Sequence, residues 1–235
     1  MSLPPPYYSE PGITLYHGDC REILPHLPKV DLVLTDPPYG IGYRHGGRRG
    51  GRLMGFDGQG IIGDAEPFDP APFLGSEATV LWGANHYANR LPPSPGWLVW
   101  DKRDSSTPND QSDCELAWTS TLTTARLFSR YWSGGAISEQ RMHVNQKPLG
   151  LMIWCLRFFP DATTILDPFC GSGTTLIAAK MLGRRAIGIE IEERYCAIAA
   201  RRLRETTPPL PGLMEPEPEQ LTLPKLLNLN ELVGD

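Results

Sequence analysis

Short apolar runs separated by turn-forming residues recur along the chain, and this pattern predicts an α/β fold. The run 30–35 is apolar and rich in β-branched residues, as buried parallel strands are. Similar runs at 78–82 and 97–100 predict two more buried strands. Apolar stretches at 149–159 and 176–182 predict helices. Strands that alternate with helices indicate a parallel sheet with helices packed against it.

The segment 165–190 predicts a βαβ unit. It reads as a strand, a turn with Gly171 and Gly173, an apolar helix that stops at Gly183, and a second strand that leads to Glu190. Glycines in the first turn let a ligand approach the backbone, and an acid after the second strand can bind ribose hydroxyls. This turn matches neither the Walker phosphate loop nor the dinucleotide-binding glycine pattern. The unit therefore favours a nucleoside without a pyrophosphate.

The residues that follow the strand 30–35 are candidates for catalysis. Asp36 stands at the carboxyl end of this strand, where open α/β sheets place their ligands. Pro37 and Pro38 stop the hydrogen-bond ladder and stiffen the turn, so the Pro37 carbonyl has a fixed direction. Tyr39 adds a flat ring. A carboxylate, a fixed carbonyl and a stacking ring suit an exocyclic amino group on an aromatic base.

The rest of the chain completes a single-domain organisation. The runs 115–118 and 125–128 predict two strands, paired as a hairpin, and 192–204 predicts the last helix. Asp19 with Glu22 fits a capping box for a helix over 20–27, and a ligand contact through Asp19 is equally open. The predicted organisation is a lead-in at 1–12, one domain at 13–204 with small insertions at 41–64 and 105–140, and a proline-rich acidic tail at 205–235.

Composition narrows the cellular setting. The chain has 235 residues and 40% hydrophobic residues, which suits one globular domain. No run reaches the roughly 18 apolar residues that cross a membrane, and the first residues do not resemble a signal peptide. The five cysteines form no CxxC pair. We therefore expect reduced thiols, a cytoplasmic location and no zinc site.

The formal net charge of −5 hides an uneven distribution. The glycine-rich segment between Tyr43 and Phe56 carries only basic charges, whereas the tail is mainly acidic. Nucleic-acid binding requires a local positive face and not a positive total. A solvated loop is the alternative for these basic residues, which are Arg44, Arg48, Arg49 and Arg52.

Together these segments resemble the amino-methylating DNA methyltransferases, which use S-adenosylmethionine. In that family DPPY, here 36–39, is the catalytic motif, and DPFxGSG, here 167–173, is the cofactor motif. The segment 143–148 resembles the family's HPxQKP segment, although it departs at two positions, and 15–19 resembles its L-x-x-G-D segment. The catalytic motif precedes the cofactor motif, as in the circularly permuted β-type members.

The resemblance implies a three-layer, seven-stranded, Rossmann-like methyltransferase sheet and methyl transfer to N6 of adenine in double-stranded DNA. It implies no metal, and a homodimer is compatible with it. Small residues after the strand 78–82 (Gly83, Ala84) and Asn85 are expected to line a purine pocket. The implied catalytic residues are Asp36, Pro37, Pro38 and Tyr39, and the implied cofactor-binding residues are Asp19, Lys147, Asp167, Phe169, Gly171, Ser172, Gly173, Thr174 and Glu190.

Three other functions stay open at this point. Methylation of N4 of cytosine is chemically similar, although its enzymes more often carry a serine at the first motif position, where this chain has Asp36. Protein-glutamine methyltransferases use NPPY and have the opposite motif order. A DNA-binding module that only senses the cofactor would not need both motifs intact.

Overall fold

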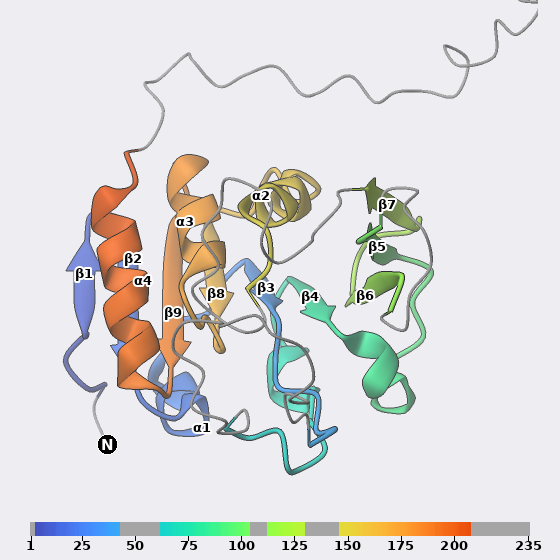
Figure 1. Cartoon of the computed structure of the whole chain (residues 1–235), viewed down its shortest axis with the longest axis horizontal. Helices are drawn as coiled ribbons and strands as arrows, with labels where there is room; N and C mark the ends of the chain where they lie inside the picture. The colour runs from blue at the N-terminus through green and yellow to red at the C-terminus, as the bar shows by residue number, and fades with distance from the viewer. Residues whose placement is uncertain (1–2, 43–61, 104–111, 130–145, 208–235) are drawn as a thin grey trace, which may run out of the picture.

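The computed structural model describes residues 3–42, 62–103, 112–129 and 146–207 (Figure 1). The nine strands of these segments form one sheet in the order β1-β2-β9-β8-β3-β4-β6-β5-β7. The strands are β1 (Tyr8–Glu10), β2 (Ile13–His17), β3 (Leu32–Thr35), β4 (Ala78–Trp82), β5 (Trp97–Asp101), β6 (Cys114–Thr119), β7 (Arg126–Ser129), β8 (Thr164–Asp167) and β9 (Arg185–Glu190). The helices are α1 (Cys20–Ile23), α2 (Leu149–Arg157), α3 (Thr174–Met181) and α4 (Glu193–Glu205), with 3-10 turns η1 (Leu24–His26), η2 (Ala71–Phe73), η3 (Ala84–His86) and η4 (Ala88–Arg90).

The centre of the sheet is parallel, and its chain order reverses between β8 and β3. Strands β2, β9, β8, β3 and β4 all run in the same direction. From β8 the chain continues through α3 to β9 on one side, whereas β3 is followed on the other side by β4. Ligands of open α/β sheets bind at the carboxyl ends of the strands beside such a reversal. The segments after β3, β8 and β9 therefore meet where a ligand site is expected.

Side chains of the central strands alternate between two hydrophobic clusters, one on each face of the sheet. Leu32 and Leu34 pack into the cluster that α2, α3 and α4 cover, while Val33 packs into the other. The second cluster is covered by α1 and by segments around the 3-10 turns, including Phe68, Phe73 and Tyr87. The described part thus has three layers, as expected, with longer helices on one face only (Figure 1).

The described sheet differs from the expected seven-stranded sheet at its two ends. The segment 1–12 was expected to be a lead-in, but Tyr8–Glu10 pairs with β2 in antiparallel fashion. The expected hairpin between 115–118 and 125–128 is wrong, because β5 lies between β6 and β7 and pairs with both. The apolar run of β5 suits an inner position with neighbours on both sides. Strand β7 is mostly exposed and suits the edge.

Helix boundaries follow local chemistry. The helix expected over 20–27 ends at Ile23 and continues as the 3-10 turn η1, because Pro25 has no N–H for the α-helical ladder. Helix α3 is followed by Gly183 at φ 68°, the left-handed conformation that glycine adopts at helix ends.

Strands β6 and β7 fall inside 105–140, so that part of the expected insertion belongs to the sheet. Within the described residues, no helix is long and apolar enough to cross a membrane.

Candidate active site

One pocket joins the two sequence motifs at the carboxyl ends of the central strands. It holds about 740 Å³ of space between atoms, with the open solvent at its mouth included. The predicted residues that line it are Asp36, Pro37, Pro38, Lys147, Asp167, Phe169, Gly171, Ser172, Thr174 and Glu190. The prediction missed Ile62, Gln146, Met152, Cys170, Thr175, Ile191 and Glu192, which also line it.

Asp36 follows β3 and receives two side-chain donors. The Tyr39 hydroxyl donates to its Oδ1 at 2.5 Å, and the Lys147 ammonium donates to its Oδ2. The Asp36 side chain is only 14% exposed. Burial raises the pKa of Asp36, and the charge of Lys147 acts in the opposite direction. A carboxylate can accept about four hydrogen bonds, so acceptor capacity remains for a ligand.

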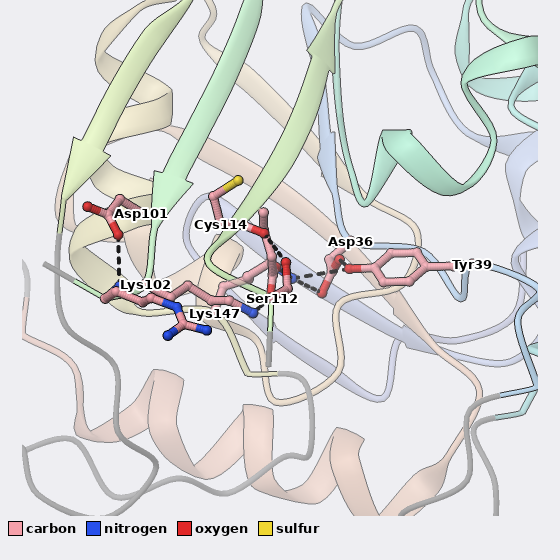
Figure 2. Close-up of polar contacts among 9 residues, drawn as sticks. Asp36, Tyr39, Asp101, Lys102, Ser112, Cys114 and Lys147 are labelled. Atoms are coloured by element: carbon pink, nitrogen blue, oxygen red, sulfur yellow. Dashed lines mark hydrogen bonds and ion pairs between the residues drawn. The ribbon is translucent and has the colours of Figure 1, made fainter. Parts of the chain in front are cut away.

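Lys147 lies beside Asp36 in the pocket. Its ammonium pairs with Asp36 and, at 2.9 Å, with Oε2 of Glu115 on β6. Burial lowers the pKa of Lys147, but the two carboxylates raise it by more, so the group stays charged. Burial acts to raise the pKa of Glu115, but the charges of Lys147 and Lys102 outweigh it and lower the pKa of Glu115 to about 2. Figure 2 shows Lys147 between Lys102 and Asp36, with Tyr39 beyond.

Glu190 ends β9 and holds the glycine turn that follows β8. Its Oε2 accepts from the backbone N–H of Gly171 and its Oε1 from that of Glu192, both at 2.8 Å. Gly171 has φ 51° and Gly173 has φ 80°, conformations that disfavour a side chain. Burial raises the pKa of Glu190 to about 7. Each Glu190 oxygen keeps a lone pair with which it can accept from a hydroxyl.

Asp167 joins the two strands on either side of the chain reversal. The Thr35 hydroxyl at the end of β3 donates to its Oδ1 at 2.6 Å, and the Phe169 N–H donates at 3.1 Å. Asp167 is 4% exposed, and burial raises its pKa to about 6. Asp167 therefore fixes the separation of the two motifs, and it also lines the pocket.

Helix α4 supports the turn from outside the pocket. The guanidinium of Arg202 donates to the carbonyl and hydroxyl of Ser172 and to the hydroxyl of Thr174. A Cβ added to Gly173 would lie 2.9 Å from the Cβ of Ala199. The turn is thus held between α4 and Glu190, which keeps its N–H groups in place before a ligand binds.

Other predicted residues lie outside the pocket lining. Asp19 caps α1 by accepting from the Arg21 N–H at 2.9 Å and pairs with the Arg21 side chain. Tyr39 stacks on His86, with 4.8 Å between ring centroids, and a Cβ on Gly83 would collide with its ring. Ala84 is buried in the second hydrophobic cluster and so cannot line an open purine pocket. The four arginines of the 41–64 segment lie outside the described residues.

Three further residues near the catalytic motif were missed by sequence reasoning. The Asp64 carboxylate accepts from the N–H groups of Gly40, at 2.8 Å, and of Ile41, so it shapes the backbone after the motif. His86 and Glu115 reach the site through strand pairing that a local pattern does not reveal. By contrast, Ile191 and Glu192 directly follow Glu190, and the strand-end rule that identified Glu190 applies to them too.

The arrangement suits a ligand that presents hydroxyls at one end and reacts with an amino group at the other. The carboxylate oxygens of Glu190, which can accept from hydroxyls, lie beside the glycine turn. Asp36 offers a carboxylate beside the fixed turn of Pro37 and Pro38. Among the described residues, no group of three or more His, Cys, Asp or Glu side chains could hold a metal ion.

Comparisons with known proteins identify the family of this chain. The family model for DNA methylases matches residues 80–201. The Type II methyltransferase M.ScaI of Streptomyces caespitosus is 30% identical over 86% of this chain and 84% of its own length. The putative methylase YubD of Escherichia coli (strain K12) is 28% identical, over 79% of this chain and 88% of its own length.

Two solved structures share the fold. The PvuII DNA methyltransferase (cytosine-N4-specific) has a TM-score of 0.59 and 18% identity, and the match covers 84% of this chain and 88% of that one. The M1.HpyAVI–SAM complex has a TM-score of 0.51 and 22% identity, with 81% and 98% covered. The methyltransferase fold, the joined motifs and the family match together show that this chain belongs to the DNA methylase family of N6/N4 amino-methyltransferases.

Proposed function

We propose that this protein transfers a methyl group from S-adenosylmethionine to N6 of adenine at specific sites in double-stranded DNA. The observation that carries the proposal is that Asp36 and Glu190 line the same pocket. One carboxylate suits an amino group and the other suits ribose hydroxyls, so the pocket can bring nucleophile and methyl donor together. The motif order of the chain is that of the β-type family members.

The residues around Glu190 fit S-adenosylmethionine. The glycine turn lets the donor approach the backbone, and Glu190 keeps acceptor capacity for two ribose hydroxyls. Asp167, Phe169, Ser172 and Thr174 line the adjoining wall. When bound, the donor supplies an electrophilic methyl group on a sulfonium. Asp19 and Lys147 remain proposed cofactor contacts, and Lys147 also meets Asp36.

Asp36 and the Pro37 carbonyl would each accept a hydrogen bond from one N–H group of the target amino group. An adenine amino group is a poor nucleophile, because its lone pair is delocalised into the ring. Two acceptors favour a pyramidal nitrogen with its lone pair directed at the methyl group, and they interact more strongly as positive charge develops on that nitrogen. Asp36 acts as an acceptor and positions the attack, while the proton leaves after transfer.

The target base of a duplex must leave the stack to reach Asp36. Tyr39 is the proposed stacking partner of the flipped base, and its hydroxyl also orients Asp36. Pro38 keeps the backbone of this turn rigid. A homodimer remains a proposal from the family resemblance.

N6 of adenine is preferred over N4 of cytosine because the first motif residue is Asp36 and not serine. The cytosine reaction is the second candidate, since both amino groups donate two hydrogen bonds. Transfer to glutamine is disfavoured, because the motif order is reversed and the first motif residue is not asparagine.

Mass spectrometry of nucleosides tests the target atom. DNA incubated with the protein and isotope-labelled S-adenosylmethionine is digested, and N6-methyladenine and N4-methylcytosine are quantified. We expect labelled N6-methyladenine alone. Labelled N4-methylcytosine without N6-methyladenine would replace the adenine assignment, and absence of label in either base would refute methyl transfer to DNA.

The basic residues Arg44, Arg48, Arg49 and Arg52 are proposed to contact DNA phosphates. Each lost phosphate contact reduces the slope of log K against log salt by about 0.9. Alanine at positions 48, 49 and 52 together should weaken binding to every duplex and flatten its salt dependence, measured by fluorescence anisotropy. The same slope in variant and wild type would mean that these arginines are only solvated.

A further inference from the structure

Glu115 lies outside both motifs, yet its carboxylate reaches the catalytic end of the pocket. Its Oε1 accepts from the Lys102 ammonium at 2.9 Å, and its Oε2 lies 2.9 Å from the Lys147 ammonium. Lys147 in turn donates to Asp36. The side chains therefore form a row of alternating charge from the end of β5 to the catalytic carboxylate, and Figure 2 shows Lys102, Lys147, Asp36 and Tyr39 of this row.

We propose that Glu115 is a positioning residue for methyl transfer, a role that rests on the proposed function. By binding Lys147, it limits the contact of the ammonium with Asp36 to the Oδ2 side. The remaining acceptor directions of Asp36 are then left for the amino group of the target base. Glu115 acts through Lys147 and does not touch the substrate.

The position of Glu115 is fixed by the sheet. Strand β6 hydrogen-bonds to β4 on one side and to β5 on the other, and Glu115 lies opposite Trp100 of β5. Lys102, one residue after β5, holds the second Glu115 oxygen. The Glu115 carboxylate thus has little freedom to follow Lys147, and it holds the ammonium at a set distance from Asp36.

Lys147 is buried and has few other partners to hold it. It is 5% exposed, its ammonium lies 3.5 Å from the Tyr39 hydroxyl, and it stands 5.9 Å from the centre of the Trp82 ring. Without the charge of Glu115, the Lys147 ammonium would form a closer ion pair with Asp36. A tighter ion pair would withdraw electron density from the oxygens that must stabilise developing positive charge on the base.

The charge of Glu115 also sets the pH range in which Asp36 can accept. The groups that face Asp36 are Lys147, Glu115, Tyr39, Tyr87 and Asp167. Burial is the largest cause of the raised pKa of Asp36, and the Glu115 carboxylate raises it further. Loss of the Glu115 charge therefore lowers the pKa of Asp36, and the acidic limb of the kcat profile moves to lower pH.

The test compares Glu115→Gln with Glu115→Asp and with Glu10→Gln, a matched control. Glu10 pairs with Lys180 at 2.8 Å on the opposite edge of the sheet and is 20% exposed, against 25% for Glu115. The readouts are kcat from about pH 5 to about pH 9 at saturating cofactor and DNA, and the cofactor Kd by calorimetry. We expect Glu115→Gln to lower kcat by at least about tenfold, to move the acidic limb to lower pH, and to leave the cofactor Kd unchanged.

The companion variants make the result specific. Glu115→Asp keeps the charge, so its acidic limb stays at the wild-type pH. Lys102→Gln frees Glu115 to draw Lys147 away from Asp36, so the acidic limb of the kcat profile of this variant moves to higher pH. If Glu115→Gln does not fold, Lys102→Gln still tests the proposal. A Glu115→Gln enzyme with wild-type kcat, or a limb unmoved in both Glu115→Gln and Lys102→Gln, would overturn the proposal. Inactive wild-type protein would instead refute the proposed function.

Discussion

At the scale of single residues, protein side chains set the orientation of the proposed catalytic carboxylate, Asp36. Asp36 accepts from Tyr39 and Lys147, so its orientation is set by neighbours in the unliganded protein. Such preorganisation is what electrostatic stabilisation of a developing charge requires. The sequence motif alone indicates an acceptor, and the structure adds the two donors that aim it.

Asp36→Asn tests this role with little change of shape. The amide keeps the size of the carboxylate but has no negative charge and only one acceptor oxygen, so its interaction with positive charge on nitrogen is weaker. We expect kcat to fall by at least about 100-fold, with cofactor affinity unchanged because Glu190 and the turn are intact. A tritium transfer assay and calorimetry provide the two readouts. Asp69→Asn, at an exposed carboxylate that accepts from the Ala71 N–H, is the control and should stay active. An Asp36→Asn enzyme with near wild-type kcat would remove Asp36 from the chemistry.

At the scale of elements, the turn between β8 and α3 is the part of the site that depends most on backbone conformation. Its conformation is fixed by Glu190 on one side and by α4 on the other. Gly171→Ala forces a Cβ onto a residue at φ 51°, which costs about 1 kcal/mol or more. The cost is relieved by a shift of the N–H that faces Glu190, so cofactor binding should weaken by at least about tenfold.

Gly183→Ala is the matched control for that prediction. Gly183 has φ 68°, and a Cβ there would meet no atom within 4 Å. This variant carries similar backbone strain away from the pocket, so it should lose stability but bind cofactor as the wild type does. Thermal melting and calorimetric titration of both variants separate the two effects. Equal cofactor affinity in the two variants would mean that the turn is not part of the cofactor site.

Elements with local signals were predicted well, and those that depend on distant pairing were not. Strand β4 and the βαβ unit follow from apolar runs and glycines that lie within a few residues. The inner position of β5 was missed, because a hairpin and a crossover have the same local pattern. Glu115 was missed for the same reason, since the place of β6 beside β4 is set by distant pairing.

At the scale of the whole molecule, the sheet brings the two motifs together. Strands β3 and β8 are neighbours although they are far apart in the sequence, and Asp167 bridges them through Thr35. The rule that open α/β sheets place ligands at the carboxyl ends of their strands predicted the position of Asp36 from the sequence. The rule does not predict the side chains contributed by β6 and by the turn η3, because these come from the other half of the sheet.

The two buried carboxylates of the pocket also make the stability of the whole fold depend on pH. Burial raises the pKa of Asp167 to about 6 and that of Glu190 to about 7, whereas both titrate near about 4 in an unfolded chain. In this interval the folded chain holds protons that the unfolded chain has released, so the unfolding free energy falls as pH rises. The contribution is fully present below about pH 4 and is lost as pH passes through about 7.

We therefore expect the melting temperature of the cofactor-free protein to drop by at least about 2 °C between about pH 6 and about pH 8. Glu190→Gln cannot ionise and should reduce the drop. Asp31→Asn is the control, because hydrogen bonds from Thr163 and Thr164 lower the pKa of Asp31 to about 2. The stabilising contribution of the Asp31 carboxylate is present above about pH 4 and is lost only as pH falls through about 2. Removal of this carboxylate therefore lowers the melting temperature equally at about pH 6 and at about pH 8. Calorimetric melts of the three proteins decide the matter. A Glu190→Gln protein whose melting temperature falls as steeply as that of the wild type would show that Glu190 is already ionised at pH 6. The Glu190 carboxylate would then bind ribose hydroxyls without a change in its protonation.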